Sequence, residues 1–87
     1  MKILAVCGVG QGTSLLLKMN ISEVLKELGI KAEVDNTDLT SANSERADYI
    51  VTNSEFAKSI RSNAKVIIVE NYFDKNEIKQ SLEKELN

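Results

Sequence analysis

Four short apolar segments, separated by stretches with helical patterning, constrain the fold of this chain most strongly. The strand candidates are Lys2–Val6, Lys31–Asp35, Asp48–Thr52 and Lys65–Val69. The continuous apolar runs at 49–51 and 66–69 are typical of buried parallel strands. Because each crossover between parallel strands is right-handed and covers a face of the sheet, this alternation predicts an α/β fold with helices on both faces.

The simplest strand order for such a chain is 2-1-3-4, which gives a four-stranded parallel sheet in a three-layer, Rossmann-like architecture. The chain changes direction between the first and third strands, and ligands of such folds bind beyond the strand C-termini at that point. We expect Cys7 to lie there, bordered by the loops around Asn36, Asn53 and residues 71–73. The exposed apolar residues expected to contact a partner at this edge are Leu16, Tyr72 and Phe73. With 87 residues, the chain is expected to form a single domain over residues 1–87.

The helices differ in how clearly the sequence marks them. Apolar residues recur at helical spacing over 13–28, where Gly29 provides a C-terminal stop, so the first helix is expected there. Leu15, Leu16 and Met19 broaden its apolar stripe, either as core or as part of a docking surface. The polar segment 36–47 predicts no more than a short helix or an irregular loop.

Two further helices are predicted from their N-terminal signals. Ser54 is the expected N-cap of a helix that carries Phe56 and Ile60. Asp74 and Glu77 form a capping-box pattern before the last helix, whose mixed lysines and glutamates indicate a solvated face. Scattered carboxylates such as Asp35, Asp38 and Glu70 are interpreted as surface groups.

The segment after the first apolar run contains the candidate catalytic and anion-binding residues. It begins at the lone cysteine and reads Cys7-Gly8-Val9-Gly10-Gln11-Gly12-Thr13-Ser14. A glycine-rich loop lets backbone N–H groups converge on an anion, and the following helix adds its positive N-terminal end. The same groups favour a thiolate. Cys7 is therefore the candidate nucleophile, beside a phosphoryl-binding cradle formed by Gly8, Val9, Gly10, Gln11, Gly12, Thr13 and Ser14.

A structural interpretation of these residues competes with the catalytic one. A single cysteine after a strand is often a small apolar filler of the core. Thr13 and Ser14 are also ordinary residues at a helix start, although Ser14 is the better candidate to steady the thiolate. Packing alone does not require the glycines, so Gly10 and Gly12 are expected to supply positive φ angles or close backbone approach.

Composition excludes several classes of function. The chain has no histidine, which removes Ser-His and Cys-His catalytic pairs and histidine metal sites. One cysteine forms no internal disulfide and suits a reducing cytoplasm, and neither a metal nor another cofactor is expected. A net charge of −2 without a basic cluster argues against nucleic acid as a partner. The apolar run at residues 1–6 is too short for a signal peptide, and no apolar run is long enough to span a membrane, so we expect a soluble protein of the cytoplasm.

The run from Lys2 to Ser14, with Lys18 and Met19, resembles the IIB component of the bacterial phosphoenolpyruvate-dependent sugar phosphotransferase system. The resemblance is greatest to the ascorbate-type branch, which is related to the lactose/cellobiose and galactitol types. It implies that Cys7 accepts a phosphoryl group from a phosphohistidine of the IIA protein. It further implies that Cys7 passes the group to a sugar, with ascorbate the candidate, bound by the membrane component IIC during uptake.

Two alternatives remain open at this point. A low-molecular-weight phosphatase or a thiol reductase also places a cysteine before a phosphate-binding loop, but the phosphatases carry an arginine where this chain has Thr13. A non-catalytic phosphate-sensing module is the other alternative. The loop lacks the Lys-Ser/Thr ending of a P-loop, which argues against nucleotide binding.

Overall fold

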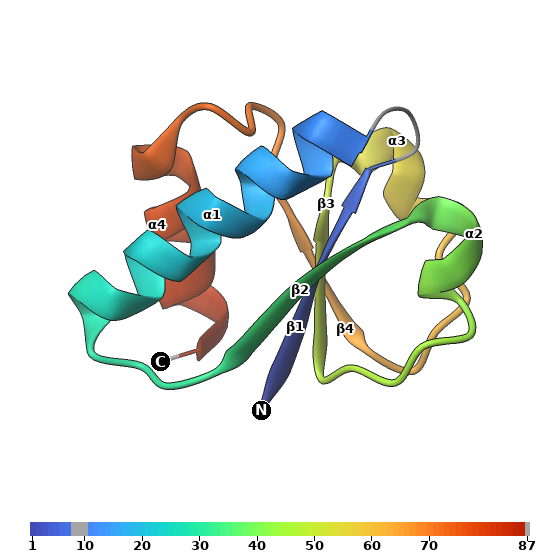
Figure 1. The fold of residues 1–87 in the computed structure, drawn as a ribbon, viewed down its shortest axis with the longest axis horizontal. Coiled ribbons are helices and arrows are strands. Elements are labelled where there is room, and N and C mark those ends of the chain that lie inside the picture. The colour runs from blue at the N-terminus through green and yellow to red at the C-terminus, as the bar shows by residue number, and fades with distance from the viewer. Residues whose placement is uncertain (8–10, 87) are drawn as a thin grey trace.

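A computed structural model describes residues 1–7 and 11–86 of the chain, with the backbone alone for residues 11–14. Strands and helices alternate along these residues (Figure 1). The elements are β1 (Lys2–Cys7), α1 (Gln11–Leu28), β2 (Glu33–Asp38), α2 (Leu39–Ala42), β3 (Tyr49–Thr52), α3 (Ser54–Ala57), β4 (Lys65–Ile68) and α4 (Lys75–Leu86).

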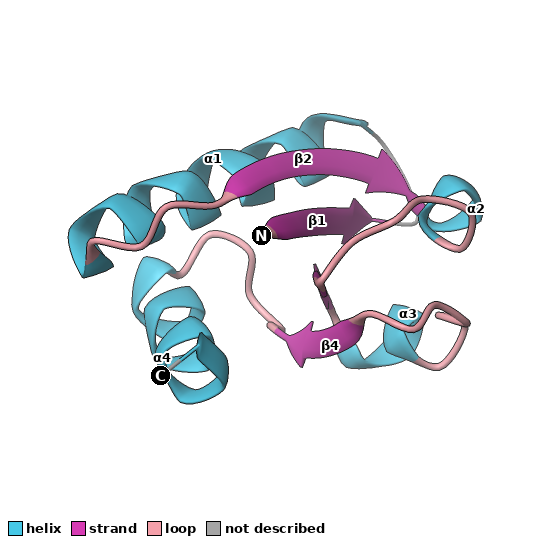
Figure 2. Cartoon of the chain, turned by 90° about the horizontal axis from the view of Figure 1, so that it is seen from below, coloured by secondary structure: helices cyan, strands magenta, loops and turns pink. Residues whose placement is uncertain are grey.

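The strands form one parallel sheet in the order β2-β1-β3-β4, which confirms the predicted topology. β1 pairs with β2 from Lys2 opposite Glu33 to Cys7 opposite Asp38, and with β3 from Ile3 opposite Tyr49. In Figure 2 the sheet is seen from below, with β2 and β1 side by side and β4 on the opposite edge. The C-terminal ends of the strands therefore share one edge of the sheet.

Helices cover both faces of the sheet, as predicted. Alternate residues of β1 point to opposite faces. Ile3, Ala5 and Cys7 belong to a buried cluster that includes residues of α1 and α4. Leu4 and Val6 belong to a second cluster, which packs against α2 and the segments around α3. Figure 1 accordingly shows α1 and α4 on one side of the sheet and α2 and α3 on the other.

All four strand predictions needed correction, and β1 ends at Cys7, one residue later than predicted. β2 begins at Glu33 and continues to Asp38, so Asn36 lies within a strand and not in a loop. Its polar sequence carries no apolar run, and its pairing with β1 sets its length. β3 begins at Tyr49, one residue later than predicted, and β4 ends at Ile68, one residue earlier. As an edge strand β4 is only partly buried, and Ile68 is 39% exposed.

The helix boundaries also differ in detail. α1 begins at Gln11, two residues before the predicted start, and ends as predicted before Gly29, whose φ is +72°. The N-cap of α3 is Asn53, which accepts a hydrogen bond from the Phe56 N–H; Ser54 is the first helical residue. α3 ends at Ala57, so the prediction that this helix carries Ile60 was wrong. Within the described residues, no helix has the length and apolar character needed to cross a membrane.

Candidate active site

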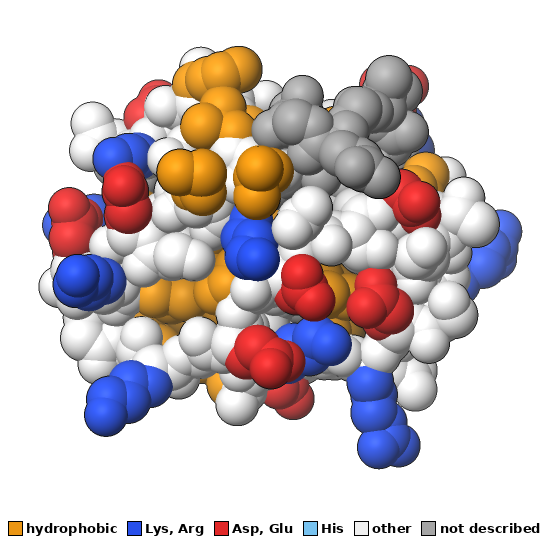
Figure 3. Space-filling view, viewed as in Figure 1, with side chains coloured by type: hydrophobic (Ala, Val, Ile, Leu, Met, Phe, Trp, Pro, Cys, Tyr) orange, Lys and Arg blue, Asp and Glu red, His pale blue; other side chains and the backbone are white. Residues whose placement is uncertain are grey.

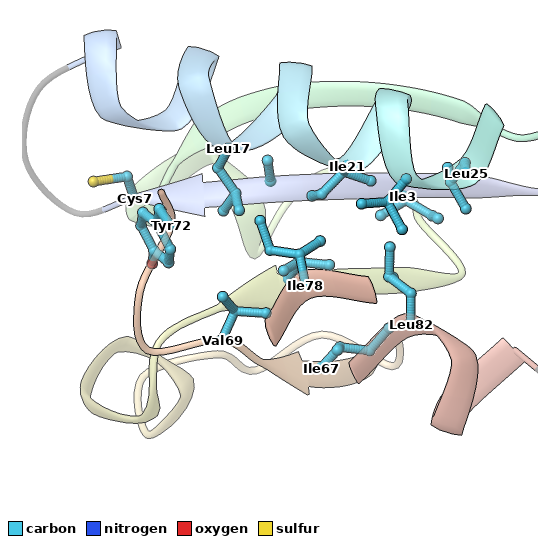
Figure 4. Packing of buried hydrophobic residues seen from close by; sticks show 13 residues of the cluster. Ile3, Cys7, Leu17, Ile21, Leu25, Ile67, Val69, Tyr72, Ile78 and Leu82 are labelled. Atoms are coloured by element: carbon cyan, nitrogen blue, oxygen red, sulfur yellow. The ribbon is translucent and has the colours of Figure 1, made fainter. Parts of the chain in front are cut away.

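Cys7 is the last residue of β1, at the C-terminal edge of the sheet. Its side chain is 8% exposed and belongs to the buried cluster under α1 and α4. Figure 4 shows the sulfur at the end of this cluster, pointing away from the core residues and close to the ring of Tyr72. The strand therefore holds a thiol at the point where the sheet ends and the cradle segment begins.

Two buried hydroxyl groups converge on the peptide that joins Val6 to Cys7. The Thr52 Oγ1 donates to the carbonyl oxygen of Val6 at 3.1 Å, and the Tyr72 phenol donates to the same oxygen at 3.3 Å. Thr52 ends the neighbouring strand β3, whereas Tyr72 lies in the loop between β4 and α4. Strands β1 and β3 and the loop before α4 thus meet at the peptide that precedes Cys7.

Tyr72 was expected to be an exposed contact residue, and that expectation was wrong. Its side chain is 7% exposed, because the phenol turns inward to Val6 and its own carbonyl accepts a hydrogen bond from the Asn20 side chain at 2.8 Å. Burial raises the pKa of the Tyr72 phenol, and the neighbouring Cys7 charge adds to the increase, although contacts with Thr52 act in the opposite direction.

The loop that carries Tyr72 is held by hydrogen bonds to Glu77 of α4. Both carboxylate oxygens of Glu77 accept from backbone N–H groups, one from Glu70 at 2.7 Å and one from Asn71 at 3.0 Å. The capping box is therefore only half correct: Asp74 caps α4 by accepting from the Glu77 N–H at 3.3 Å, but the Glu77 side chain serves this loop instead. Glu77 thus holds the segment before Tyr72 in place.

An apolar patch lies beside this loop. We define the docking patch as Leu15, Met19 and Phe73, which are 47%, 54% and 73% exposed. Figure 3 shows hydrophobic side chains gathered over the first half of α1 and the loop before α4. Phe73 confirms the prediction of an exposed aromatic residue at this edge, whereas Leu16 is only partly exposed.

The predicted cradle is only partly within the described residues. Gly8, Val9 and Gly10 lie outside them, as do the side chains of Gln11, Thr13 and Ser14. The backbone from Gln11 to Ser14 forms the first turn of α1, where N–H groups have no partner inside the helix. A positive φ at Gly12 is therefore not needed, since a helical residue has negative φ, and close approach to the backbone is the remaining reason for a glycine there.

The polar side chains at the other strand ends serve the backbone. Asp38, opposite Cys7 in the register, caps α2 by accepting from the Ser41 N–H at 2.7 Å. This hydrogen bond and that of the Ser41 side chain hold the Asp38 pKa below its ordinary value. Asn53 caps α3, and Asn71 accepts from the Phe73 N–H at 3.0 Å. These residues shape the edge but were not recognised from sequence as caps.

The two arginines lie far from this edge. Arg46 and Arg61 are exposed and line a polar hollow of about 890 Å³ together with Lys2, the first residue of β1. This hollow is at the N-terminal end of the sheet, so neither guanidinium is placed to clamp a phosphate at Cys7. Within the described residues, His, Cys, Asp and Glu form no group of three or more that could hold a metal ion.

Comparisons with known proteins agree with one of the three sequence interpretations. The family model described as "PTS system, Lactose/Cellobiose specific IIB subunit" matches residues 2–84. A protein of Mycoplasma pneumoniae named "Ascorbate-specific PTS system EIIB component" is 40% identical over 88 residues, which cover 97% of this chain and 93% of that protein. The protein of the same name from Salmonella choleraesuis is 35% identical, over 80% of this chain and 73% of its own length.

Proposed function

This chain belongs to the lactose/cellobiose-type IIB family of the phosphotransferase system, and from this premise we propose that Cys7 carries the phosphoryl group. A IIB component is a phosphoryl carrier and a phosphotransferase. The observation that supports Cys7 is its position: the one cysteine ends a central strand, immediately before the segment that leads into α1. No histidine is available in the chain to take this role.

The transfer requires little from this chain beyond a placed nucleophile and charge stabilisation. The Cys7 sulfur attacks the phosphorus of a phosphohistidine on IIA, so that an S–P bond forms while the N–P bond breaks and the thiol proton passes to the histidine. In the second step a substrate hydroxyl attacks the phosphorus, the S–P bond breaks, and the sulfur regains a proton from that hydroxyl. An in-line displacement with stabilised equatorial oxygens is the general requirement.

We assign that stabilisation to the backbone N–H groups of residues 8–14, with the hydroxyls of Thr13 and Ser14 as further donors. The support is local: α1 begins at Gln11, so its unpartnered N–H groups and the positive end of its dipole lie within a few residues of Cys7. Without a guanidinium at the site, the phosphocysteine would not be set up for rapid hydrolysis, which suits a carrier.

The partners follow from membership in the family. A IIB component works between IIA and the membrane component IIC. In this chain we propose that IIA is the phosphoryl donor, that IIC presents the acceptor, and that exchange takes place in the cytoplasm through one domain formed by residues 1–87. Ascorbate is the proposed substrate, because the relatives at 40% and 35% identity are both named as ascorbate-specific.

The phosphatase and phosphate-sensing alternatives gain no support from the structure. A phosphatase of this type clamps phosphate with an arginine, and both arginines of this chain lie at the opposite end of the sheet. A sensing module would not require the thiol. Turnover of p-nitrophenyl phosphate that disappears in Cys7→Ala would favour the phosphatase.

Replacing the nucleophile tests the proposal. Cys7→Ser keeps the size of the side chain but lacks a thiol, and no base is available to activate its hydroxyl. We expect this variant to fold and to accept no phosphoryl group from phosphorylated IIA, while Ser44→Ala, a surface control far from the site, accepts it normally. Acceptance by Cys7→Ser at the wild-type rate would refute the assignment.

A further inference from the structure

The peptide unit that carries Cys7 receives two side-chain hydrogen bonds. The Val6 carbonyl belongs to the same rigid plane as the Cys7 N–H, so any tilt of this plane moves the Cys7 Cα and its sulfur. Thr52 and Tyr72 hold the oxygen of that plane from two different segments, at 3.1 and 3.3 Å. Both donors are buried, at 0% and 7% exposure. Water therefore does not readily substitute for them.

Thr52 acts where backbone pairing stops. β1 and β3 pair through Ile3–Tyr49, Leu4–Ile50 and Ala5–Val51, so the next partner of Val6 in this register would be Thr52. The Thr52 hydroxyl reaches this position and continues the connection between the strands by one residue. The final part of β1 is thereby tied to the centre of the sheet just before the reactive residue.

Tyr72 acts from the loop that precedes α4, and it is itself anchored on two sides. Its carbonyl accepts from the buried Asn20 side chain of α1 at 2.8 Å, while its phenol donates to Val6. Figure 4 shows the ring directly below Cys7, at the end of the buried cluster. The ordinary pKa of a phenol already lies well above neutral pH, and burial raises the pKa of Tyr72 further, so the phenol is a hydrogen-bond donor.

From this geometry we infer that Tyr72 and Thr52 are positioning residues for Cys7, whose two hydroxyl groups fix the Val6–Cys7 peptide and so aim the sulfur along the line of phosphoryl transfer. The inference deepens the proposed function and rests on it. Neither hydroxyl touches the phosphoryl group in this account. Each acts through the backbone of Cys7.

The expected size of the effect follows from the sensitivity of transfer reactions to alignment. Displacing a reacting atom by about 1 Å costs on the order of 100-fold in rate. Losing one of two hydrogen bonds to the same carbonyl should shift the sulfur less, so we expect about a tenfold decrease for either Tyr72→Phe or Thr52→Val. Because the two hydroxyls share one acceptor, their effects should not be additive in the double variant.

The experiment measures single-turnover phosphoryl transfer from phosphorylated IIA over a range of IIA concentrations. Tyr72→Phe and Thr52→Val should lower the saturating rate about tenfold and leave the half-saturating IIA concentration unchanged. Thr52→Ser retains the hydroxyl and should restore most of the rate. The matched control is Tyr49→Phe, which removes the other phenol at the opposite end of β3 and should transfer at the wild-type rate.

A second measurement keeps this inference distinguishable from the proposed function. Alkylation of Cys7 by iodoacetamide in the protein alone needs no IIA and no transfer. Because Cys7 is buried, with 8% of the residue exposed, releasing its strand end in Tyr72→Phe or Thr52→Val should accelerate alkylation several-fold, with no change in Tyr49→Phe. If Cys7→Ser still accepts phosphoryl groups, the proposed function fails, yet this alkylation result still decides the positioning role.

Two results would overturn the inference. One is wild-type alkylation and transfer in both Tyr72→Phe and Thr52→Val. The other is a decrease in transfer that Tyr49→Phe or Thr52→Ser reproduces in full, since the effect would then come from side-chain shape or general stability and not from the hydroxyl groups.

Discussion

The two faces of the sheet are covered very differently. On one face α1 and α4 contribute 18 and 12 residues, and they enclose the larger buried cluster. On the other face α2 and α3 have four residues each, and the cluster beneath them has few fully buried side chains, among them Leu4, Val6 and Ile50. Cys7 belongs to the first face.

The long and the short helices are stabilised in different ways. The long helices bury apolar side chains, and their packing carries most of the hydrophobic stabilisation of the fold. The short helices depend on their N-caps: Asp38, the last residue of β2, and Asn53, which follows β3, each accept from a backbone N–H in the first turn of the helix. Cys7 packs in the buried cluster with residues of α1 and α4, whereas the neighbouring strand ends are held by the caps Asp38 and Asn53.

The largest expected effect is on the free energy of unfolding, when one isoleucine on each face is replaced by alanine. Ile78 belongs to α4 and is fully buried, so Ile78→Ala should lower the free energy of unfolding by about 3–4 kcal/mol through lost transfer energy and a residual cavity. Ile60 is only partly buried on the other face, so Ile60→Ala should cost about 1 kcal/mol. Urea denaturation measures both, and equal losses would contradict the comparison.

The second prediction concerns binding of IIA. The docking patch borders the face that carries Cys7, so Phe73→Ser should weaken binding of IIA roughly tenfold while leaving the unfolding free energy nearly unchanged. Ile68 is 39% exposed on β4, and alternation along the strand turns it to the other face. Ile68→Ser is therefore the control. Titrations followed by NMR would show the patch to be misplaced if Ile68→Ser weakened binding as much.

The smallest expected effect is on the free energy of unfolding, and it comes from the charge of the Asp38 cap and its response to pH. The folded-state pKa of Asp38 is lowered, so its charge stabilises the protein above the ordinary carboxyl pKa, and this contribution is lost as pH falls through the folded value. Asp38→Asn keeps a capping oxygen without the charge. Its unfolding free energy should fall slightly below that of wild type at pH 7, and the difference should vanish in acid. A difference of the same size at neutral pH and throughout the acid range would exclude the charge as the cause.

The features that follow from repeated patterns were predictable from the sequence. The apolar spacing from Leu17 to Leu28 and the stop at Gly29 predicted α1 correctly near its C-terminus, because a buried helical face requires that spacing. Alternating strands and helices predicted the sheet order, since few topologies satisfy right-handed crossovers. The position of Cys7 at the strand C-termini followed from that order.

Features set by tertiary partners were not predictable. The polar strand β2 is extended because β1 supplies its hydrogen bonds, and nothing in its own residues indicates six strand positions. The sequence around Tyr72 is typical of an exposed loop, but its phenol donates to the Val6 carbonyl, next to Cys7. One available signal was missed: Asn20 interrupts the apolar face between Leu17 and Ile21, and a buried amide requires a partner, which is the Tyr72 carbonyl.

If Cys7 carries the phosphoryl group, the modification can be located on it by mass spectrometry. Wild-type protein would be incubated with phosphorylated IIA, digested and analysed by mass spectrometry under conditions that preserve phosphocysteine. The account predicts one phosphoryl group per chain, on the peptide that contains Cys7 and on its sulfur. A phosphoryl group on Thr13, Ser14 or any residue other than Cys7 would contradict it.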